Sequence, residues 1–218
     1  MRKLLSATLV ALCAVSCVWN TPLYNDTTMA DVIDATTLKT DAGITYKVVD
    51  QLCDGTLEAG KRVLAACNVM KKKTETEYDV ELVTFLVPLK KETVKSSSVT
   101  DPLGDDPVFV NSLWISGGYL NMRFTVQELE EGKVHTMNLE WLDTQPADTL
   151  RFVMHHDDGI DGIHIPSDED RDVMYGSAYA TFPIKALVPA GVKEMPVKIN
   201  WNWEKEYCVK DGLKIVLE

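Results

Sequence analysis

Apolar and polar residues alternate with a period of two through most of the chain, and this pattern constrains the fold more than any other feature. Successive side chains of a β-strand point to opposite faces, so the pattern predicts strands that each have one apolar face. It is cleanest in 120–126, 135–141, 150–154, 197–204 and 213–217. No long segment has the 3.6-residue period of an amphipathic helix. The sequence therefore predicts an all-β protein.

The alternating segments fall into two groups, which predicts two domains. Short strands are expected near 31–38, 44–50, 61–70, 78–87 and 89–95, and five such strands fit a small OB-like barrel. A segment rich in Ser, Gly, Pro and Asp follows and has the composition of a linker. The later strands must stack as two sheets, which predicts an antiparallel β-sandwich. The expected domains are a barrel over 30–98, a linker over 99–107 and a sandwich over 108–218.

The N-terminus has the pattern of a secretory signal peptide. Arg2 and Lys3 precede an apolar run that is too short for a permanent membrane-spanning helix. The run ends in Ala14-Val15-Ser16-Cys17, which resembles a bacterial lipobox. We therefore expect removal of residues 1–16 and lipidation of Cys17, with a plain secreted signal as the alternative. Residues 17–29 are expected to form a tether.

The charge balance restricts the partners of the chain. It has 22 basic and 33 acidic residues, and loss of Arg2 and Lys3 with the signal peptide changes the net charge from −11 to −13. Nucleic-acid binding requires clustered positive charge, so no nucleic-acid partner is expected. The acidic body should also stand off an anionic lipid surface. We expect a cell-envelope protein on the outer membrane, and the absence of an acidic cluster after Cys17 favours the periplasmic face.

The segment 155–172 has the highest density of metal-binding residue types, with three of the four histidines and seven carboxylates. Imidazole with carboxylate suits Zn or Mn, and carboxylates between glycine turns suit Ca. The candidate ligands are His156, Asp157, Asp161 and His164. The spacing matches neither HExxH nor an EF-hand loop, and His155 should point away from His156 on a strand. The alternative is a strand end followed by a solvated acidic hairpin loop.

Two other features are candidates for ligand binding. Trp201 and Trp203 share a strand face; exposed, they would form a platform for sugars or an apolar partner. Apolar neighbours on the same face favour a place in the core instead. OB-like barrels often bind oligonucleotides or oligosaccharides, but Lys71-Lys72-Lys73 and Lys90-Lys91 are expected to be solvated strand ends and turns.

Several motifs, in order along the chain, resemble the NigD-like lipoproteins of Bacteroidetes. They are Lys61-Arg62-Val63-Leu64, Trp114 with Gly118-Tyr119-Leu120-Asn121, His135, the run from Leu150 to Asp157, and Val197-Lys198-Ile199-Asn200-Trp201. The resemblance covers nearly the whole mature chain. It implies a lipoprotein signal, an OB-type barrel and a C-terminal β-sandwich, and it brings no functional residues with it.

Two covalent modifications are also candidates. Asp26-Thr27-Thr28 resembles the Asp-Thr-X acceptor of O-glycosylation in Bacteroides-type bacteria, which makes Thr27 a candidate. Cys53, Cys67 and Cys208 remain after processing, and an envelope location permits a Cys53–Cys67 disulfide. The alternative is that Cys67 is a small buried residue, because it alternates with apolar residues on one strand face.

The sequence has no motif that points to catalysis. G-x-S-x-G, the P-loop and GxGxxG are all missing from it, and we predict neither a catalytic residue nor a cofactor. The expected function is that of a membrane-tethered binding or interaction module, with an envelope protein or a glycan as partner. The alternatives are a metal-binding protein or metal-dependent hydrolase that uses 155–172, and a purely structural lipoprotein.

Overall fold

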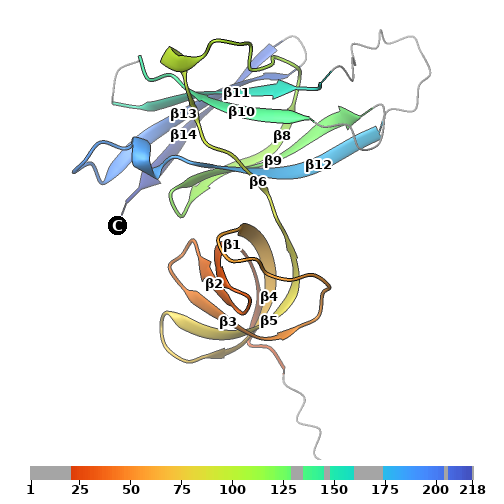
Figure 1. The fold of residues 1–218 in the computed structure, drawn as a ribbon. Coiled ribbons are helices and arrows are strands. Elements are labelled where there is room, and N and C mark those ends of the chain that lie inside the picture. The colour runs from red at the N-terminus through yellow and green to blue at the C-terminus, as the bar shows by residue number, and fades with distance from the viewer. Residues whose placement is uncertain (1–20, 129–134, 145–147, 160–173, 204–205, 218) are drawn as a thin grey trace, which may run out of the picture.

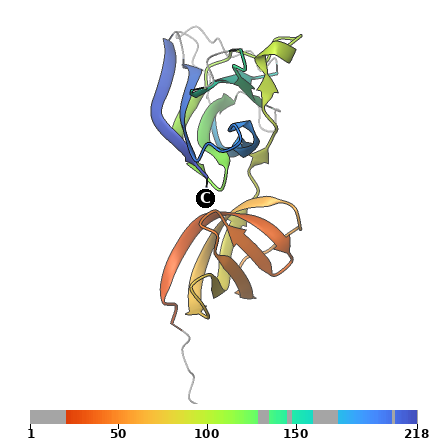
Figure 2. The same cartoon turned by 90° about the vertical axis from the view of Figure 1, so that its left-hand side faces the viewer.

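The protein consists of two β-domains stacked end to end, a barrel below and a sandwich above (Figures 1 and 2). The computed structural model describes all residues except 1–20, 129–134, 145–147, 160–173, 204–205 and 218. Within the described part the helices are two short 3-10 turns, Ser96–Ser98 (η1) and Lys185–Leu187 (η2). No helix there is long and apolar enough to cross a membrane. The all-β prediction is confirmed.

Five strands close the barrel in the order β1-β2-β3-β5-β4. They are β1 (Tyr24–Asp34), β2 (Thr37–Thr40), β3 (Thr45–Gln51), β4 (Arg62–Lys72) and β5 (Glu77–Leu86). Strand β1 closes the barrel against β4 in antiparallel register, and β3 runs parallel to β5. The prediction of a five-stranded OB-like barrel is therefore confirmed, although the strand expected over 31–38 is divided between β1 and β2, and the segment 89–95 is not part of the barrel. Its core consists of Ala30, Val32, Leu38, Tyr46, Leu57, Val63, Ala65, Cys67, Val69, Tyr78, Val80 and Leu82.

The barrel begins earlier than the sequence predicted. Strand β1 starts at Tyr24, so the second half of the expected tether over 17–29 is a strand paired with β4 from Tyr24 opposite Val69 onward. The polar residues at its start concealed it. Asp26 is half-buried and accepts a hydrogen bond from the Tyr46 hydroxyl, so a polar side chain is satisfied at this end of the barrel.

Two sheets form the sandwich, in the orders β14-β13-β11-β10-β7 and β6-β12-β9-β8. The strands are β6 (Leu89–Lys90), β7 (Val94–Lys95), β8 (Phe109–Ser116), β9 (Tyr119–Glu128), β10 (Thr136–Trp141), β11 (Leu150–Asp157), β12 (Met174–Pro183), β13 (Glu194–Trp203) and β14 (Glu206–Val216). The predicted sandwich is present, but it is mixed rather than purely antiparallel. Strands β6, β7 and β13 run parallel to β12, β10 and β11, because the chain crosses between sheets before each of these pairs forms.

The domain boundary lies before residue 89, not at the predicted linker. Residues 89–98, assigned to the barrel from sequence, belong to the sandwich, because β6 pairs with β12 and β7 pairs with β10. The chain that leaves the barrel thus gives one edge strand to each sheet. Residues 99–107, predicted as a linker, lie within the second domain. The sandwich core consists of residues from both sheets: Val108, Leu120, Met122, Phe124, Val126, Met137, Leu139, Leu150, Phe152, Met154, Ala180, Phe182, Ile184, Met195, Val197, Ile199 and Ile215.

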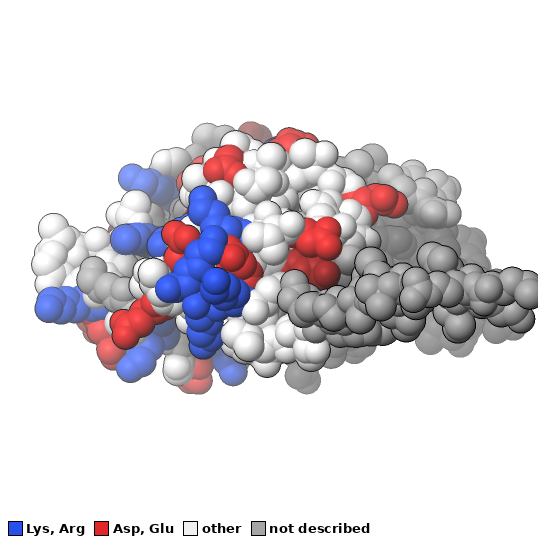
Figure 3. All heavy atoms as spheres, turned by 90° about the horizontal axis from the view of Figure 1, so that it is seen from below, with Lys and Arg blue, Asp and Glu red and all other residues white. Residues whose placement is uncertain are grey.

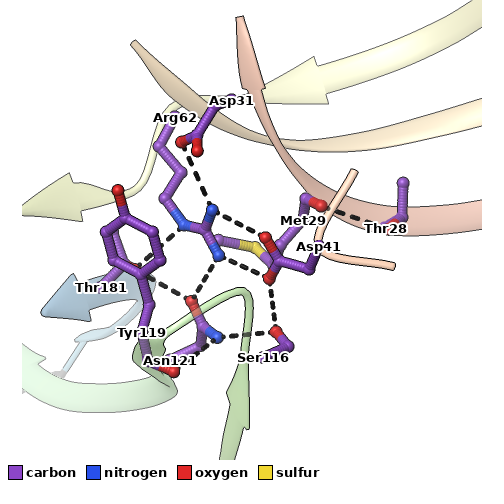
Figure 4. Close-up of polar contacts among 9 residues, drawn as sticks. All are labelled: Thr28, Met29, Asp31, Asp41, Arg62, Ser116, Tyr119, Asn121 and Thr181. Atoms are coloured by element: carbon purple, nitrogen blue, oxygen red, sulfur yellow. Dashed lines mark hydrogen bonds and ion pairs between the residues drawn. The ribbon is translucent and has the colours of Figure 1, made fainter. Parts of the chain in front are cut away.

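A buried arginine lies where the two domains meet (Figure 4). Arg62, at the start of β4, is only 1% exposed. Its two terminal nitrogens donate to the two carboxylate oxygens of Asp41 at 2.9 and 2.6 Å, and Asp31 lies 3.4 Å away. A buried charge is tolerated only when it is paired and hydrogen-bonded, and this two-point contact supplies both conditions.

The sandwich completes the surroundings of the Arg62 guanidinium. The Asn121 and Thr181 side-chain oxygens accept from it at 3.3 and 3.2 Å, and the Tyr119 ring centre lies 3.9 Å from its central carbon. Ser116 also donates a hydrogen bond to Asp41. Polar groups of both domains are therefore satisfied only when the domains are joined, which couples them into one body.

The turn between β8 and β9 makes this junction sensitive to a single methyl group. A Cβ atom on Gly117, whose φ is +59°, would lie 2.3 Å from the Asp41 Oδ1 atom. We expect Gly117→Ala to lower the free energy of unfolding by about 1–2 kcal/mol, because it adds a clash to left-handed backbone strain. Urea denaturation measures this. Gly191→Ala is the matched control, since Gly191 also has positive φ but open space around it. Equal losses in both variants would contradict the contact.

Candidate functional site

The end of β11 carries the predicted His-His-Asp cluster, and the segment 103–108 lies against it. We call this segment the strap. It belongs to the region predicted as a linker, but the structure holds it on the sandwich through both backbone and side-chain bonds. His155 and His156 contact it from opposite sides of β11, as the alternation predicts.

His155 holds the strap on the outer face of the sheet. Its Nδ1 donates to the Gly104 carbonyl oxygen at 2.8 Å, and its Nε2 lies 2.9 Å from a carboxylate oxygen of Glu140. The strap passes very close to β11 here, since a Cβ on Gly104 would lie 2.3 Å from the His156 carbonyl oxygen. Only a glycine fits at this position.

His156 holds the strap from the core side and is only 3% exposed. A carbonyl can only accept, so the His156 Nδ1 donates to the Pro107 oxygen at 3.0 Å. The Nε2 atom lies 2.9 Å from the Nδ1 of His135, and the planes of the two rings are nearly parallel. Burial, and then the neighbouring His135, lower the pKa of His156 below its usual 6.5. The ring is therefore neutral, and its Nε2 accepts from His135.

Further bonds run along the length of the strap. They are Asn138 to the Leu103 carbonyl, the Asp106 amide to the His156 carbonyl, the Asn202 side chain to the Asp105 carbonyl, the Tyr207 hydroxyl to the Asp105 carboxylate, and the Val108 amide to the Asn202 carbonyl. The strap thus ties β10, β11, β13 and β14 together. In its described part, the polar cluster that suggested metal binding instead holds the strap on the sandwich.

The predicted metal ligands do not converge in the described part of the chain. His156 is buried with both ring nitrogens hydrogen-bonded, whereas Asp157 leaves the strand on the other side and is exposed. Asp161 and His164 lie outside the described residues. The carboxylates of Asp106, Asp157 and Asp158 do gather, with ligand atoms within 4.8 Å of one another.

This acidic group was missed from the sequence, because Asp106 lies about fifty residues upstream in the supposed linker. Hydrogen bonds already engage it: Asp106 accepts from the Asp158 amide, and Asp157 accepts from the Gly159 amide. Carboxylate oxygens are the ligands that Ca²⁺ prefers. Exposed acidic groups are common without an ion, so this geometry by itself assigns none.

Comparison with protein families identifies the sandwich. The model of the NigD-like C-terminal beta sandwich domain matches residues 90–211, which is more than half of the chain. The chain belongs to the NigD-like family. The match begins within β6, in agreement with a domain boundary before residue 89. The resemblance noted in the sequence is thus confirmed.

Solved structures from Bacteroides and Parabacteroides species share the whole architecture. A candidate toxin-related protein of Parabacteroides distasonis has a TM-score of 0.68 at 16% identity, over 88% of this chain and 94% of that one. A NigD-like immunity protein of Bacteroides caccae has a TM-score of 0.60 at 17% identity, over 89% of this chain and 98% of that one. A candidate lipoprotein of Bacteroides fragilis has a TM-score of 0.58 at 11% identity, over 89% of this chain and 99% of that one. At these identities the likeness shows the fold alone. No curated protein is significantly similar to the chain.

The two tryptophans of this NigD-like chain have different environments. Trp201 is half-buried and packs against the sandwich core, as predicted for both. Trp203 lies at the rim, where its ring meets that of Phe109 edge-on with centroids 5.3 Å apart. Phe109 and Tyr207 are exposed large side chains. The sugar platform expected from an exposed tryptophan pair is therefore not formed by Trp201 and Trp203 together.

The candidate modification sites of the NigD-like chain lie on the barrel or before it. Cys53 and Cys67 are free thiols at the same barrel core, and burial raises the pKa of Cys67 to about 12, so its thiol stays protonated. Thr27 is exposed on β1, where it pairs with Ala66. Cys17 lies outside the described residues.

The barrel of the NigD-like chain also bears a shallow pocket. Its volume is about 220 Å³, below the 300–1,000 Å³ or so of typical ligand pockets. The pocket is lined by Thr56, Glu58, Lys61, Val63, Phe85 and Val87. Its charged members are one acid and one base, a pair too sparse to suggest a reaction.

Proposed function

We propose that the chain is a lipid-anchored protein of the cell envelope that acts by binding a partner, not by catalysis. The observation that carries this proposal is the position of the chain start. The described chain begins at Thr21, at the end of the barrel opposite the sandwich, four positions after Cys17 (Figures 1 and 2). A lipid on Cys17 would therefore hold the body by one end. The names of the Bacteroides fragilis and Bacteroides caccae neighbours support an envelope setting.

The proposed absence of catalysis rests on how the chemically able side chains are used. His155 and His156 fasten the strap, and Arg62 with Asp41 joins the domains. These groups stabilise the body. A rigid two-domain body on a lipid anchor is suited to presenting a surface, on the periplasmic face of the outer membrane in our proposal.

The surface that we propose for partner contact is the rim of the sandwich that carries the exposed Phe109 and Tyr207, with the half-buried Trp203 beside Phe109. Exposed aromatic side chains contribute most to protein and glycan contacts, because they bury large areas at low entropic cost. An envelope protein or a glycan is the partner. Cross-linking in intact cells, followed by comparison of wild type with Phe109→Ala, tests this surface. An unchanged set of cross-linked products in the variant would contradict it.

The lipid anchor makes a direct prediction. In a Bacteroides-type host, Cys17→Ala should move the protein from the membrane to the soluble fraction, with a loss of membrane-bound protein of about tenfold or more. The measurement is fractionation followed by immunoblotting. Cys208→Ala is the matched control, because it removes a cysteine from the sandwich and should leave the distribution unchanged. A Cys17→Ala protein that stays in the membrane fraction would overturn the proposal.

A further inference from the structure

We infer that the barrel end where the chain begins rests in the lipid headgroup layer, with Lys71 and Lys72 against the phosphates of anionic phospholipid. This inference rests on the proposed Cys17 anchor and goes beyond it, because an anchor alone fixes neither the orientation nor the lipid contact of the body. The sandwich then points away from the membrane. The net charge of the mature chain had suggested the reverse, a body repelled by anionic lipid.

The length of chain between lipid and barrel carries the first step. Three residues separate Cys17 from Thr21, and a fully extended chain over this interval spans at most about 14 Å. The Leu23 amide already donates to the Val69 carbonyl at 2.7 Å, so the chain is part of the barrel from there. The interfacial layer on each side of a bilayer is roughly 5–8 Å thick. The barrel end therefore cannot stand far from the headgroups.

The side chains at this end carry the second step. Leu23 is 59% exposed and Tyr24 is 39% exposed, beside the start of β1. The Lys72 ammonium lies 5.2 Å from the Tyr24 ring and 5.0 Å from the Tyr78 ring. Figure 3 looks onto the molecule from the barrel end and shows lysine and arginine side chains gathered there. Tyrosine with lysine is the combination found at membrane interfaces.

The charges of the β4–β5 hairpin carry the third step. Lys73 is neutralised within the protein, by Asp79 at 2.6 Å and Glu77 at 3.9 Å. Lys71 and Lys72 are exposed, and the Lys72 ammonium lies over the ring of Tyr24 at the start of β1. Each lysine near an anionic surface gains about 1 kcal/mol, within a Debye length of about 8 Å. The hairpin 71–79 has three lysines and three acids, Glu75, Glu77 and Asp79, so its net charge is zero, whereas the mature body carries −13. An anionic surface therefore repels this end less than the rest of the body.

The test places a fluorophore at each end of the lipidated protein. Glu75→Cys, on the hairpin, and Asp101→Cys, just after η1 on the far side of the sandwich, are each labelled in a Cys53→Ser, Cys208→Ser background (Figure 1). Cys67 is buried and Cys17 is blocked by its lipid. The labelled proteins are inserted into phosphatidylcholine vesicles with or without phosphatidylglycerol. Both vesicle types contain a lipid with a quencher on its headgroup.

We expect quenching at position 75 to exceed that at 101 by about threefold in the anionic vesicles. Lys71→Glu with Lys72→Glu should reduce this ratio in anionic vesicles and leave it nearly unchanged in neutral ones. Lys198→Glu with Lys210→Glu, on the sandwich, should leave it unchanged in both. Equal quenching at both positions, or a ratio insensitive to Lys71 and Lys72, would overturn the inference. Protein that does not float with the vesicles would contradict the anchor itself, and the inference with it.

Discussion

Arg62→Ala is expected to lower the free energy of unfolding by about 3–5 kcal/mol, the cost of breaking a buried ion pair from one side. Asp41 would keep its charge in a nearly buried position without the two hydrogen bonds at 2.9 and 2.6 Å. The Thr181 oxygen would lose its donor and the Tyr119 ring its cation, while the Asn121 oxygen would keep only the Thr181 hydroxyl as a donor. Because polar groups of both domains lose a hydrogen-bond partner, the two domains of the variant should also unfold separately.

Urea denaturation followed by two probes measures this loss. Tryptophan fluorescence reports the sandwich, which holds all the described tryptophans, and hydrogen exchange reports the barrel. The two transitions should coincide in the wild type and separate in Arg62→Ala. Arg123→Ala is the matched control, because Arg123 is exposed on β9 and its loss should cost less than about 0.5 kcal/mol. Equal costs for the two arginines would show that the junction does not depend on Arg62.

His156→Leu is expected to cost about 2–3 kcal/mol at neutral pH. It removes the donor to the Pro107 carbonyl and the acceptor for His135, and both of these partners are half-buried. His155→Leu is the comparison, since it removes the same kind of side chain from the half-buried outer side of the strap. A larger cost for His155→Leu would contradict the role assigned to the buried ring.

The same histidine predicts a pH dependence. Burial and His135 hold the folded-state pKa of His156 below 6.5, although Asp106 and Asp158 act in the opposite direction. At pH values between the folded-state pKa and 6.5, the unfolded chain binds more protons than the folded protein. The contribution of His156 to stability is therefore complete above about pH 6.5. That contribution falls as the pH drops toward the folded-state pKa, by at most about 1.4 kcal/mol per pH unit. Urea denaturation from pH 7.5 to 5.5 should show this slope reduced in His156→Leu; equal slopes would contradict it.

The domains were predictable where one face of a strand is uniformly apolar. Strands β4 and β5 and most strands of the sandwich follow period-two alternation, and their cores formed as expected. The start of strand β1 was predicted too late in the sequence, because its first residues include the polar Asn25, Asp26 and Thr27. The edge strands β6 and β7 are two residues long each, so neither has a period to detect.

The candidate site was less predictable, because its bonds join distant segments. Alternation placed His155 and His156 on opposite sides of β11, but the strap that they hold is about fifty residues upstream. Its Gly, Pro and Asp residues have the composition of a linker. Arg62 stood in a motif that resembles the NigD-like lipoproteins, yet a basic residue at the start of a strand carries no sign of burial. Asn121 and Tyr119 stood in a second such motif, and the fold brings the two motifs together.

The intact mass of the mature protein, purified from membranes of a Bacteroides-type host, tests the central claim most directly. The proposed lipid anchor predicts a polypeptide that begins at Cys17 and carries acyl chains, which would fix the barrel at the end of a tether only a few residues long. The same spectrum reports Thr27, where an O-glycan would add further mass. An unmodified polypeptide, whether it starts at Met1 or at any later residue, would contradict the claim.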